Sequence, residues 1–328
     1  MKGILLINLG SPKDLDDKSI KEFLIEFLSD DLVIDYPKII QQTLVRGVIV
    51  PFRYKNTQAA YEEIWSTKGS PLIEMSKKVS KKLEDKISSP VEIGMRYQEP
   101  SIEQGLESLV NKGCNEIKVI PLYPHYAIST TLTTKNKVEE IVSNLDCNLN
   151  IEYVDHFYDS KNYIKALSSS IQDYIKPETD LLLFSYHGIP KRHLKKATLE
   201  RNHSEELCLK SQCVIKEFCY RHQVMETSRL CAEELNLSED QWKVSFQSRV
   251  GPGWLQPFTD KELEKFPSLG IKNLTVACPS FVSDNLETLE EINMEARETF
   301  MENGGEKFNY APCLNDDELW IEFLASIS

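Results

Sequence analysis

The sequence predicts an α/β protein made of two similar lobes, each with a parallel sheet. Short apolar, strand-like runs alternate with longer segments of helical periodicity, which is typical of parallel α/β proteins. The chain has 328 residues, about the length of two average domains. Three strand-and-loop pairs recur in the same order in both halves, so we place the lobes at residues 1–156 and 157–328.

In the first half, the run from Gly3 to Asn8 is typical of a buried strand, because apolar residues follow one another without interruption. Ile20, Phe23 and Leu24 recur at helical spacing in the segment that follows. The pattern predicts strands at 3–8, 91–96 and 116–122, and helices at 19–28, 61–65, 71–87 and 102–112.

The second half repeats this plan, with strands at 180–186, 243–247 and 273–277. A helix with an apolar stripe is expected to begin near residue 284. Ligands of open parallel sheets bind outside the carboxyl ends of the strands. If the two lobes face each other, the loops after these strands line one active-site cleft between them.

Composition and charge exclude several classes of protein. The chain has 38 Lys and Arg against 51 Asp and Glu, a net charge of −13, which opposes general nucleic-acid binding. Neither a Walker A loop nor GxGxxG occurs, which argues against a nucleotide enzyme. The uncharged stretch 119–134 is too short to cross a membrane, and no signal sequence is recognisable, so a cytoplasmic protein is expected.

Titratable residues follow two of the predicted strands. His187 comes at a strand end, before a Gly and a Pro, where it suits either proton transfer or a plain loop hydrogen bond. Asp284, Glu287 and Glu291 are three and four residues apart, so a helix places them on one face. Asp284 and Glu287 also have the spacing of a capping box, and a solvated acidic face is the ordinary alternative.

The eight cysteines are unevenly distributed, because four of them fall between residues 208 and 231. In a reducing compartment, metal ligation by thiolates explains such clustering better than disulfides do. The four residues are Cys208, Cys213, Cys219 and Cys231, and His222 offers a mixed Cys/His alternative.

Seven segments, in order along the chain, resemble ferrochelatases. They are residues 8–12 (NLGSP), 69–72 (GSPL), 95–97 (MRY), 121–126 (PLYPHY), 185–190 (SYHGIP), 246–251 (FQSRVG) and 281–289 (FVSDNLETL). Together they extend over nearly the whole chain, and seven in sequence are highly specific. The resemblance implies a lyase of chelatase-like fold, with two Rossmann-like lobes and the porphyrin between them. It would insert Fe(II) into protoporphyrin IX and release two protons, the final step of haem biosynthesis.

The resemblance also implies roles for the titratable residues. His187 stands at the family's active-site histidine, as proton acceptor and transient iron ligand. Glu287 and Glu291 correspond to carboxylates that line the cleft, with Glu287 as a second iron ligand, and Asp284 would both cap the helix and line the site. Many members have His where Asn285 stands, so a relay through a second imidazole is absent or rerouted here.

A porphyrin needs a wide apolar slot and a few cations for its propionates. The resemblance implies that this slot is lined by Arg53, Tyr61, Ser70, Arg96, Tyr123, Trp254 and Phe281. The two arginines would bind propionates or order the cleft, while each aromatic taken alone suits a core better than a slot. The basic stretch 191–201 is either a solvated helix face or a contact with anionic lipid, that is, with the inner face of the membrane.

Some ferrochelatases bind a 2Fe–2S cluster, in certain bacterial members through an internal segment. The resemblance implies such a cluster on Cys208, Cys213, Cys219 and Cys231, with structural zinc or no metal as alternatives. For the activity, the alternatives are a coproporphyrin III ferrochelatase, a porphyrin- or haem-binding protein without catalysis, and a cobalt or nickel chelatase of related fold. The oligomeric state is left open.

Overall fold

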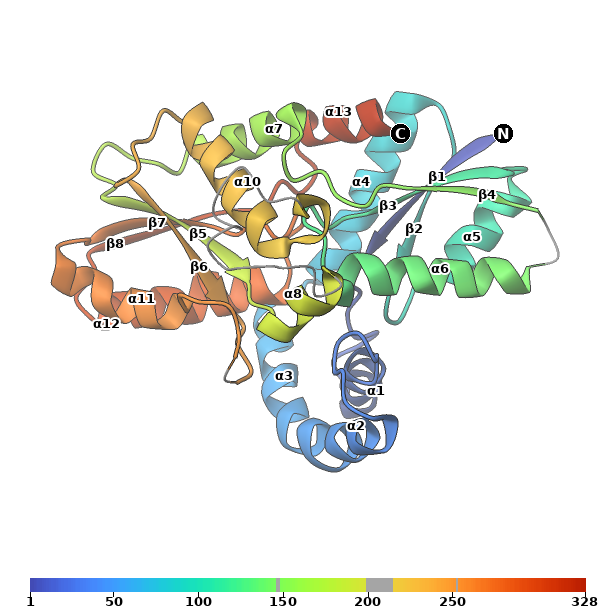
Figure 1. Cartoon of the computed structure of the whole chain (residues 1–328), viewed down its shortest axis with the longest axis horizontal. Helices are drawn as coiled ribbons and strands as arrows, with labels where there is room; N and C mark the ends of the chain where they lie inside the picture. Colours follow the sequence, from blue (N-terminus) through green and yellow to red (C-terminus); the bar gives the residue numbers. More distant parts are fainter. Residues whose placement is uncertain (146–147, 199–214, 252) are drawn as a thin grey trace. The chain divides into compact units, whose positions relative to one another are not determined.

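A computed structural model of the chain describes residues 1–145, 148–198, 215–251 and 253–328 (Figure 1). The chain divides into two compact units. Unit 1 comprises Met1–Leu122, Ile128–Asp155 and Leu324–Ser328, and unit 2 comprises Tyr123–Ala127 and His156–Phe323. Among the described residues, no helix is long and apolar enough to span a membrane.

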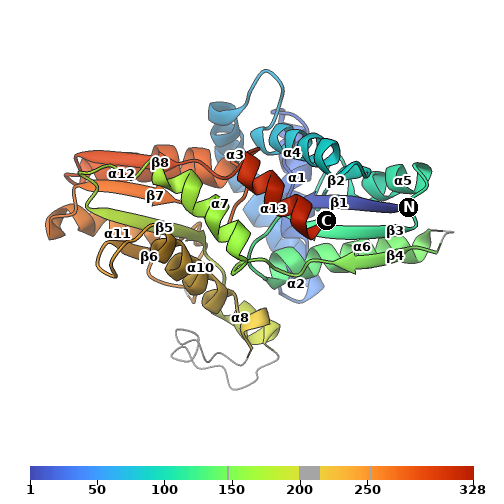
Figure 2. The same cartoon turned by 90° about the horizontal axis from the view of Figure 1, so that it is seen from above.

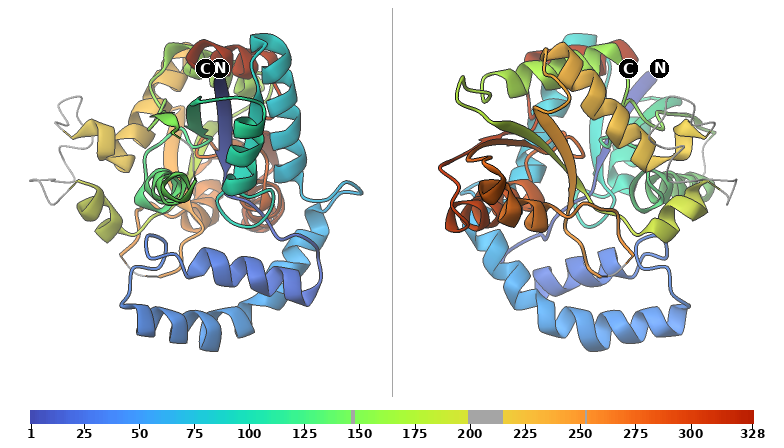
Figure 3. Two further views of the ribbon diagram at one scale, coloured as in Figure 1. Left: turned by 90° about the vertical axis from the view of Figure 1, so that its right-hand side faces the viewer. Right: turned by 60° about the vertical axis from the view of Figure 1, so that its left-hand side comes forward.

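Unit 1 contains a four-stranded parallel sheet in the order β2-β1-β3-β4. Its strands are β1 (Lys2–Asn8), β2 (Val91–Met95), β3 (Glu116–Pro121) and β4 (Asn150–Tyr153). Its helices are α1 (Asp17–Leu28), α2 (Lys38–Leu44), the π-helix η1 (Val45–Ile49), α3 (Val50–Ile64), α4 (Pro71–Ile87), α5 (Ile102–Asn111), the π-helix η2 (Ile128–Leu132) and α6 (Thr133–Asn144). Figure 3 shows α1, α2 and α3, in blue, beyond the carboxyl end of β1.

Local chemistry explains where the elements of unit 1 begin and turn. The carboxylate of Asp16 accepts two backbone N–H groups in the first turn of α1. Ser101 and its partner Gln104 form a reciprocal capping box at the start of α5. The turn after β1 requires Gly10, because its φ is +104° and a Cβ there would lie 1.9 Å from the carbonyl oxygen of Tyr97. The chain therefore leaves the end of β1 along one defined path.

Unit 2 has a second four-stranded parallel sheet, in the order β6-β5-β7-β8. Its strands are β5 (Leu181–His187), β6 (Trp242–Gln247), β7 (Asn273–Ala277) and β8 (Lys307–Ala311). Its helical segments are α7 (Lys161–Gln172), α8 (Lys191–Ala197), the 3₁₀ turn η3 (Lys216–Phe218), α10 (Tyr220–Glu234), α11 (Thr259–Lys265), the 3₁₀ turn η4 (Phe266–Leu269), the π-helix η5 (Glu287–Ala296) and α12 (Arg297–Glu302). The last helix of the chain is α13 (Glu318–Ile327).

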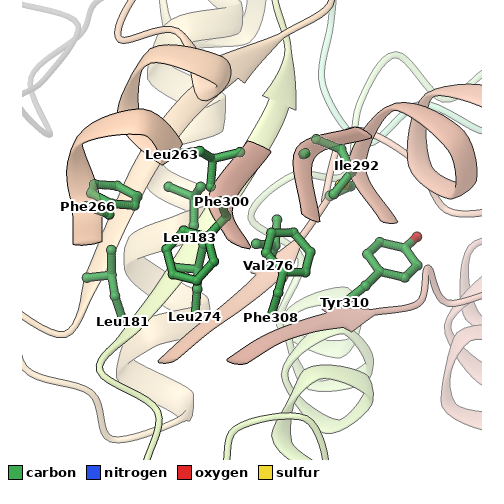
Figure 4. Packing of buried hydrophobic residues seen from close by; sticks show 12 residues of the cluster. Leu181, Leu183, Leu263, Phe266, Leu274, Val276, Ile292, Phe300, Phe308 and Tyr310 are labelled. Atoms are coloured by element: carbon green, nitrogen blue, oxygen red, sulfur yellow. The ribbon is translucent and has the colours of Figure 1, made fainter. Parts of the chain in front are cut away.

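Helices cover both faces of the sheet in unit 2, with α7 and α10 on one face and α11 and α12 on the other (Figure 1). One core cluster joins Leu183 and Val276 of the strands to Leu263, Ile292 and Phe300 of the helices (Figure 4). Burial of such side chains stabilises each by about 1.5–3 kcal/mol. This packing holds the carboxyl ends of β5, β6 and β7 in place.

The two sheets have the same strand order, since in each the second, first, third and fourth strands along the chain lie side by side (Figure 2). The predicted fold class, an α/β protein with two similar parallel-sheet lobes, is thereby confirmed. Two predicted helices differ from the structure. The helix expected at 61–65 is the end of the longer α3, and the one expected from residue 284 is the π-helix η5, which begins at Glu287.

Candidate active site

His187 is the last residue of β5 and lies half-buried at the carboxyl end of that strand. Its ring packs edge-on against Phe281, with ring centroids 6.1 Å apart. The next residue must be Gly188, since a Cβ there would lie 2.8 Å from the carbonyl oxygen of Gln247 and 3.3 Å from the ring of Trp254. Phe281 and Trp254, both predicted to line the porphyrin slot, therefore flank the turn that carries His187.

The carboxylates of Glu287 and Glu291 both come from the π-helix η5. Glu291 accepts hydrogen bonds from the backbone N–H of Ser248, at 2.7 Å, and from the hydroxyl of the same residue. Burial raises the pKa of Glu291 to about 7, and the neighbouring charge of Glu287 adds to this shift. The half-buried carboxyl of Glu291 can therefore exchange a proton near neutral pH.

Gln247 connects the end of the sheet to η5. It pairs with His187 across β5 and β6, and its amide oxygen accepts from the hydroxyl of Ser185 at 2.8 Å. Its amide N–H group donates to the carbonyl oxygen of Glu287 at 3.1 Å and to the carboxylate of Glu291 at 3.5 Å. Gln247 is thus paired with His187 through the backbone and hydrogen-bonded to the backbone of Glu287 and the carboxylate of Glu291.

Asp284 lies before η5, so it is not on the helical face predicted for it. Its carboxylate accepts hydrogen bonds from the Tyr310 hydroxyl, the backbone N–H of Cys313, the Thr288 hydroxyl and the amide of Asn315. Four donors occupy the acceptor sites of a carboxylate. Asp284 anchors the start of the helix, and its predicted catalytic role stays a prediction.

Asn285 is buried and also serves the start of η5. Its side-chain oxygen accepts from the backbone N–H of Thr288 at 3.1 Å, and its amide N–H group donates to the carbonyl oxygen of Ser283 at 3.3 Å. An amide used in this way caps the helix. Where many family members have an ionisable histidine, this chain therefore has an asparagine that caps the helix.

The ferrochelatase family model matches residues 1–328. This chain belongs to the ferrochelatase family. Ferrochelatases from Opitutus terrae and Legionella pneumophila are 44% and 40% identical to it, each over 99% of this chain and over 96% and 98% of their own length. The enzyme is therefore a lyase that inserts iron into a porphyrin in haem synthesis, as predicted.

Solved structures support the fold of this ferrochelatase. SirB from Bacillus subtilis with Fe3+ matches with a TM-score of 0.53 at 14% identity, over 99% of this chain and 93% of its own. The sirohydrochlorin chelatase SirB of B. subtilis subspecies spizizenii, in complex with cobalt, matches with a TM-score of 0.54 at 13% identity, over 98% and 91%. At these identities the likeness concerns the chelatase-like fold alone.

Four of the predicted porphyrin-binding residues lie in unit 1. Arg96 is largely buried and forms an ion pair with Asp30, while its Nε donates to the hydroxyl of Thr133 at 2.9 Å. Its guanidinium is thus already bound, which fits the ordering role better than direct propionate binding. Arg53, in contrast, is exposed on α3.

The other two predicted residues of unit 1 are buried. Tyr61 packs edge-on against Phe23 and Trp65, with ring centroids 6.3 and 5.9 Å away. Ser70 immediately precedes α4. Both therefore belong to the packed interior of this unit, and their contact with a porphyrin stays a prediction. Tyr123, the remaining member of the predicted slot, is also buried and lies in unit 2.

The predicted cluster ligands do not form one set. Cys208 and Cys213 lie outside the described residues. Cys219 caps the start of α10, where its sulfur accepts the backbone N–H of His222 at 3.4 Å. Cys231 lies in the last turns of the same helix and contacts the hydroxyl of Ser168 at 3.2 Å.

Cys231 follows Cys219 by twelve positions along α10, which at a rise of 1.5 Å per residue is about 18 Å. One two-iron cluster cannot bind two thiolates that far apart. α10 therefore does not bring Cys219 and Cys231 together, and the four-cysteine site, two of whose residues lie outside the described ranges, stays a prediction. Within the described ranges no group of three or more His, Cys, Asp or Glu residues is arranged to hold a metal.

Several residues around His187 were not predicted as site residues. Ser248 and Gln247 bind the carboxylate of Glu291, while the adjacent Arg249 pairs with Asp260 at 2.8 Å. The signal was present, because Gln247 and Ser248 directly follow the core of a predicted strand. The end of a strand predicts that the next residues lie near the site. It does not predict whether Ser248 or Arg249 contacts Glu291.

Proposed function

We propose that this ferrochelatase uses Fe(II) and protoporphyrin IX, with His187 as proton acceptor and Glu287 and Glu291 as the carboxylates that handle iron and protons. The observation that supports this is the position of Gln247, which is paired with His187 and hydrogen-bonded to both glutamates. Gln247 thereby links the three residues, whose imidazole and carboxylates supply a base for pyrrole protons and oxygen and nitrogen ligands for a divalent ion.

The reaction removes two pyrrole protons as iron enters the macrocycle. In the proposed mechanism the imidazole of His187 accepts a pyrrole proton and can bind iron before transfer. An imidazole is suited to both roles, because histidine side chains in general change charge near neutral pH. Glu287 would be the second iron ligand, and the half-buried Glu291 would take up or pass on a proton. Phe281 and Trp254 beside the His187 turn supply apolar surface for the porphyrin face.

The test is anaerobic insertion of Fe(II), followed by the Soret shift. We expect His187→Ala to abolish insertion and to leave porphyrin affinity within about twofold. Glu287→Gln should slow insertion at least tenfold. Glu298→Gln, which changes an exposed glutamate of the adjacent α12, should match the wild type. Retained turnover by His187→Ala would overturn the assignment.

The same assay, run with protoporphyrin IX and coproporphyrin III, decides the porphyrin. The proposal predicts the higher kcat/KM with protoporphyrin, and a higher value with coproporphyrin III would replace it. A non-catalytic binding protein would bind both porphyrins without insertion. The 2Fe–2S cluster is left out of the proposed function, because Cys219 and Cys231 lie at opposite ends of α10.

We further propose peripheral membrane contact through unit 1. Large apolar side chains are exposed on the continuous helical segment α2–η1–α3, among them Ile39 at 83% and Phe52 at 81% exposure. Arg46 and Arg53 lie on the same segment. Exposed apolar groups flanked by cations suit the surface of an anionic bilayer. The test is sedimentation with anionic vesicles, in which Phe52→Asp should lower the bound fraction, and equal binding would contradict the proposal.

A further inference from the structure

Three hydrogen bonds form a closed ring on the backbone of His187. The backbone N–H of His187 donates to the hydroxyl oxygen of Ser280 at 3.1 Å. The hydroxyl of Tyr220 donates to the carbonyl oxygen of His187 at 2.8 Å, and the two hydroxyls lie 2.9 Å apart. An amide N–H can only donate and a carbonyl can only accept, so Ser280 must donate to Tyr220. Every member of the ring is then satisfied.

This ring of hydrogen bonds takes the place of strand pairing between β5 and β7, which ends before His187. The N–H of Gly188 donates to Gln247 on β6, so the N–H and C=O of His187 point to the other side, toward β7. The pairing between β5 and β7 ends at Phe184 and Ala277, three residues before His187. Side chains of Ser280 and Tyr220 therefore satisfy the backbone groups that a longer β7 would have bound.

We propose that Tyr220 and Ser280 are positioning residues, which set the orientation of the His187 imidazole by fixing the peptide groups on both sides of its Cα. The inference rests on the proposed role of His187 as proton acceptor. Hydrogen bonds in a buried ring strengthen one another, and catalysis depends steeply on the placement of the base. Loss of either hydroxyl opens the ring and leaves a backbone group of His187 without its partner.

The ring of Tyr220 is held independently of its hydroxyl. It is buried, it is the first residue of α10, and it packs edge-on against His125 with ring centroids 5.9 Å apart. Tyr220→Phe therefore removes the hydroxyl and keeps the packing. The substitution tests orientation of His187 rather than the presence of the helix.

Tyr186→Phe is a matched control. Tyr186 is the residue before His187, it is fully buried, and its hydroxyl lies 2.7 Å from that of Ser228, also on α10. Each variant removes one tyrosine hydroxyl between β5 and α10, with two hydrogen bonds lost in Tyr220→Phe and one in Tyr186→Phe, so losses of thermal stability of the same order are expected. Only Tyr220→Phe removes a hydrogen bond to the peptide of His187.

We expect Tyr220→Phe to lower kcat for anaerobic Fe(II) insertion about tenfold, with KM for porphyrin within twofold, while Tyr186→Phe stays within twofold in both. Ser280→Ala should lower kcat to a similar degree. The double variant Tyr220→Phe/Ser280→Ala should be no slower than the slower single variant, because either change opens the same ring. Ser280→Thr keeps the hydroxyl and should recover most of the activity.

Equal kcat values for Tyr220→Phe and Tyr186→Phe would overturn the inference, as would losses that multiply in the double variant or that fall on KM. Should Tyr220→Phe fail to fold, the pair Ser280→Ala and Ser280→Thr decides in its place. His187→Ala is measured alongside. If it retains turnover, the proposed function fails; if it is inactive while Tyr220→Phe is unaffected, only the positioning role fails.

Discussion

His125 should make the protein less stable at mildly acidic pH. Its ring is buried, and its Nε2 lies 2.9 Å from the hydroxyl of Thr227. That hydroxyl donates its proton to the carbonyl oxygen of Tyr158, so Nε2 must be the protonated nitrogen and the donor. Nδ1 is buried, and no hydrogen-bond partner for it occurs among the described residues. A second proton on this ring would have no acceptor.

The size of the effect follows from the pKa. Burial, with a smaller contribution from His156, lowers the pKa of His125 from 6.5 to about 3. Between these values the unfolded chain binds a proton that the folded chain does not, so stability falls as the pH falls through this window. From pH 7 to pH 5 the loss from this single group is about 2 kcal/mol, and well below pH 3 it reaches about 5 kcal/mol.

The assay is urea unfolding at pH 7 and pH 5, for the wild type and for His125→Gln. A glutamine amide can still donate to Thr227 but does not titrate. The variant loses ring contacts with Tyr186 and Tyr220, so we expect it to be less stable at both pH values. All other titrating groups are shared, so its loss between pH 7 and pH 5 should be about 2 kcal/mol smaller than that of the wild type. Equal losses in the two proteins would refute the reasoning.

Three further predictions concern other parts of the chain. Asp30→Asn removes the negative charge paired with the largely buried Arg96 and should lower the free energy of unfolding by about 3 kcal/mol in urea titrations; a loss under about 1 kcal/mol would contradict the ion pair. Gly10→Ala should lower the thermal midpoint by several degrees, because its Cβ would clash with the carbonyl of Tyr97, and an unchanged midpoint would be inconsistent with the +104° φ. Cys231→Ala should leave the iron content and visible spectrum of air-free protein as in the wild type, so a lost absorption band would restore this thiol as a ligand.

The strands could be predicted because strands of parallel sheets that are buried on both faces have nearly continuous apolar sequences. The expected 3–8 and 180–186 correspond to β1 and β5 within one residue at each end. Both are nearly continuous apolar runs, as burial on two faces requires. The same apolar pattern placed His187 at the end of a strand. It therefore also predicted where the candidate site lies.

The π-helix η5 could not be predicted in this way. The apolar residues Leu289, Ile292, Ala296 and Phe300 recur at spacings of three and four, which both an α-helix and a wider helix can bury against one core. The contacts that accompany the wider helix come from residues outside this segment. Gln247 binds the carbonyl oxygen of Glu287 and the carboxylate of Glu291, and this contact joins residues forty positions apart.

The cysteine cluster shows the reverse case, in which secondary structure limits what spacing alone suggests. Four thiols within 24 residues indicate a metal site only if the backbone between them can fold back. A helix cannot do so, and eleven helical residues between two cysteines hold their Cα atoms about 18 Å apart. Among the described residues of this region, Tyr220, next to Cys219, donates a hydrogen bond to the backbone of His187, because the first residue of a helix can turn its side chain toward the strand end. Spacing is therefore evidence for a ligand set only together with the conformation of the chain between the ligands.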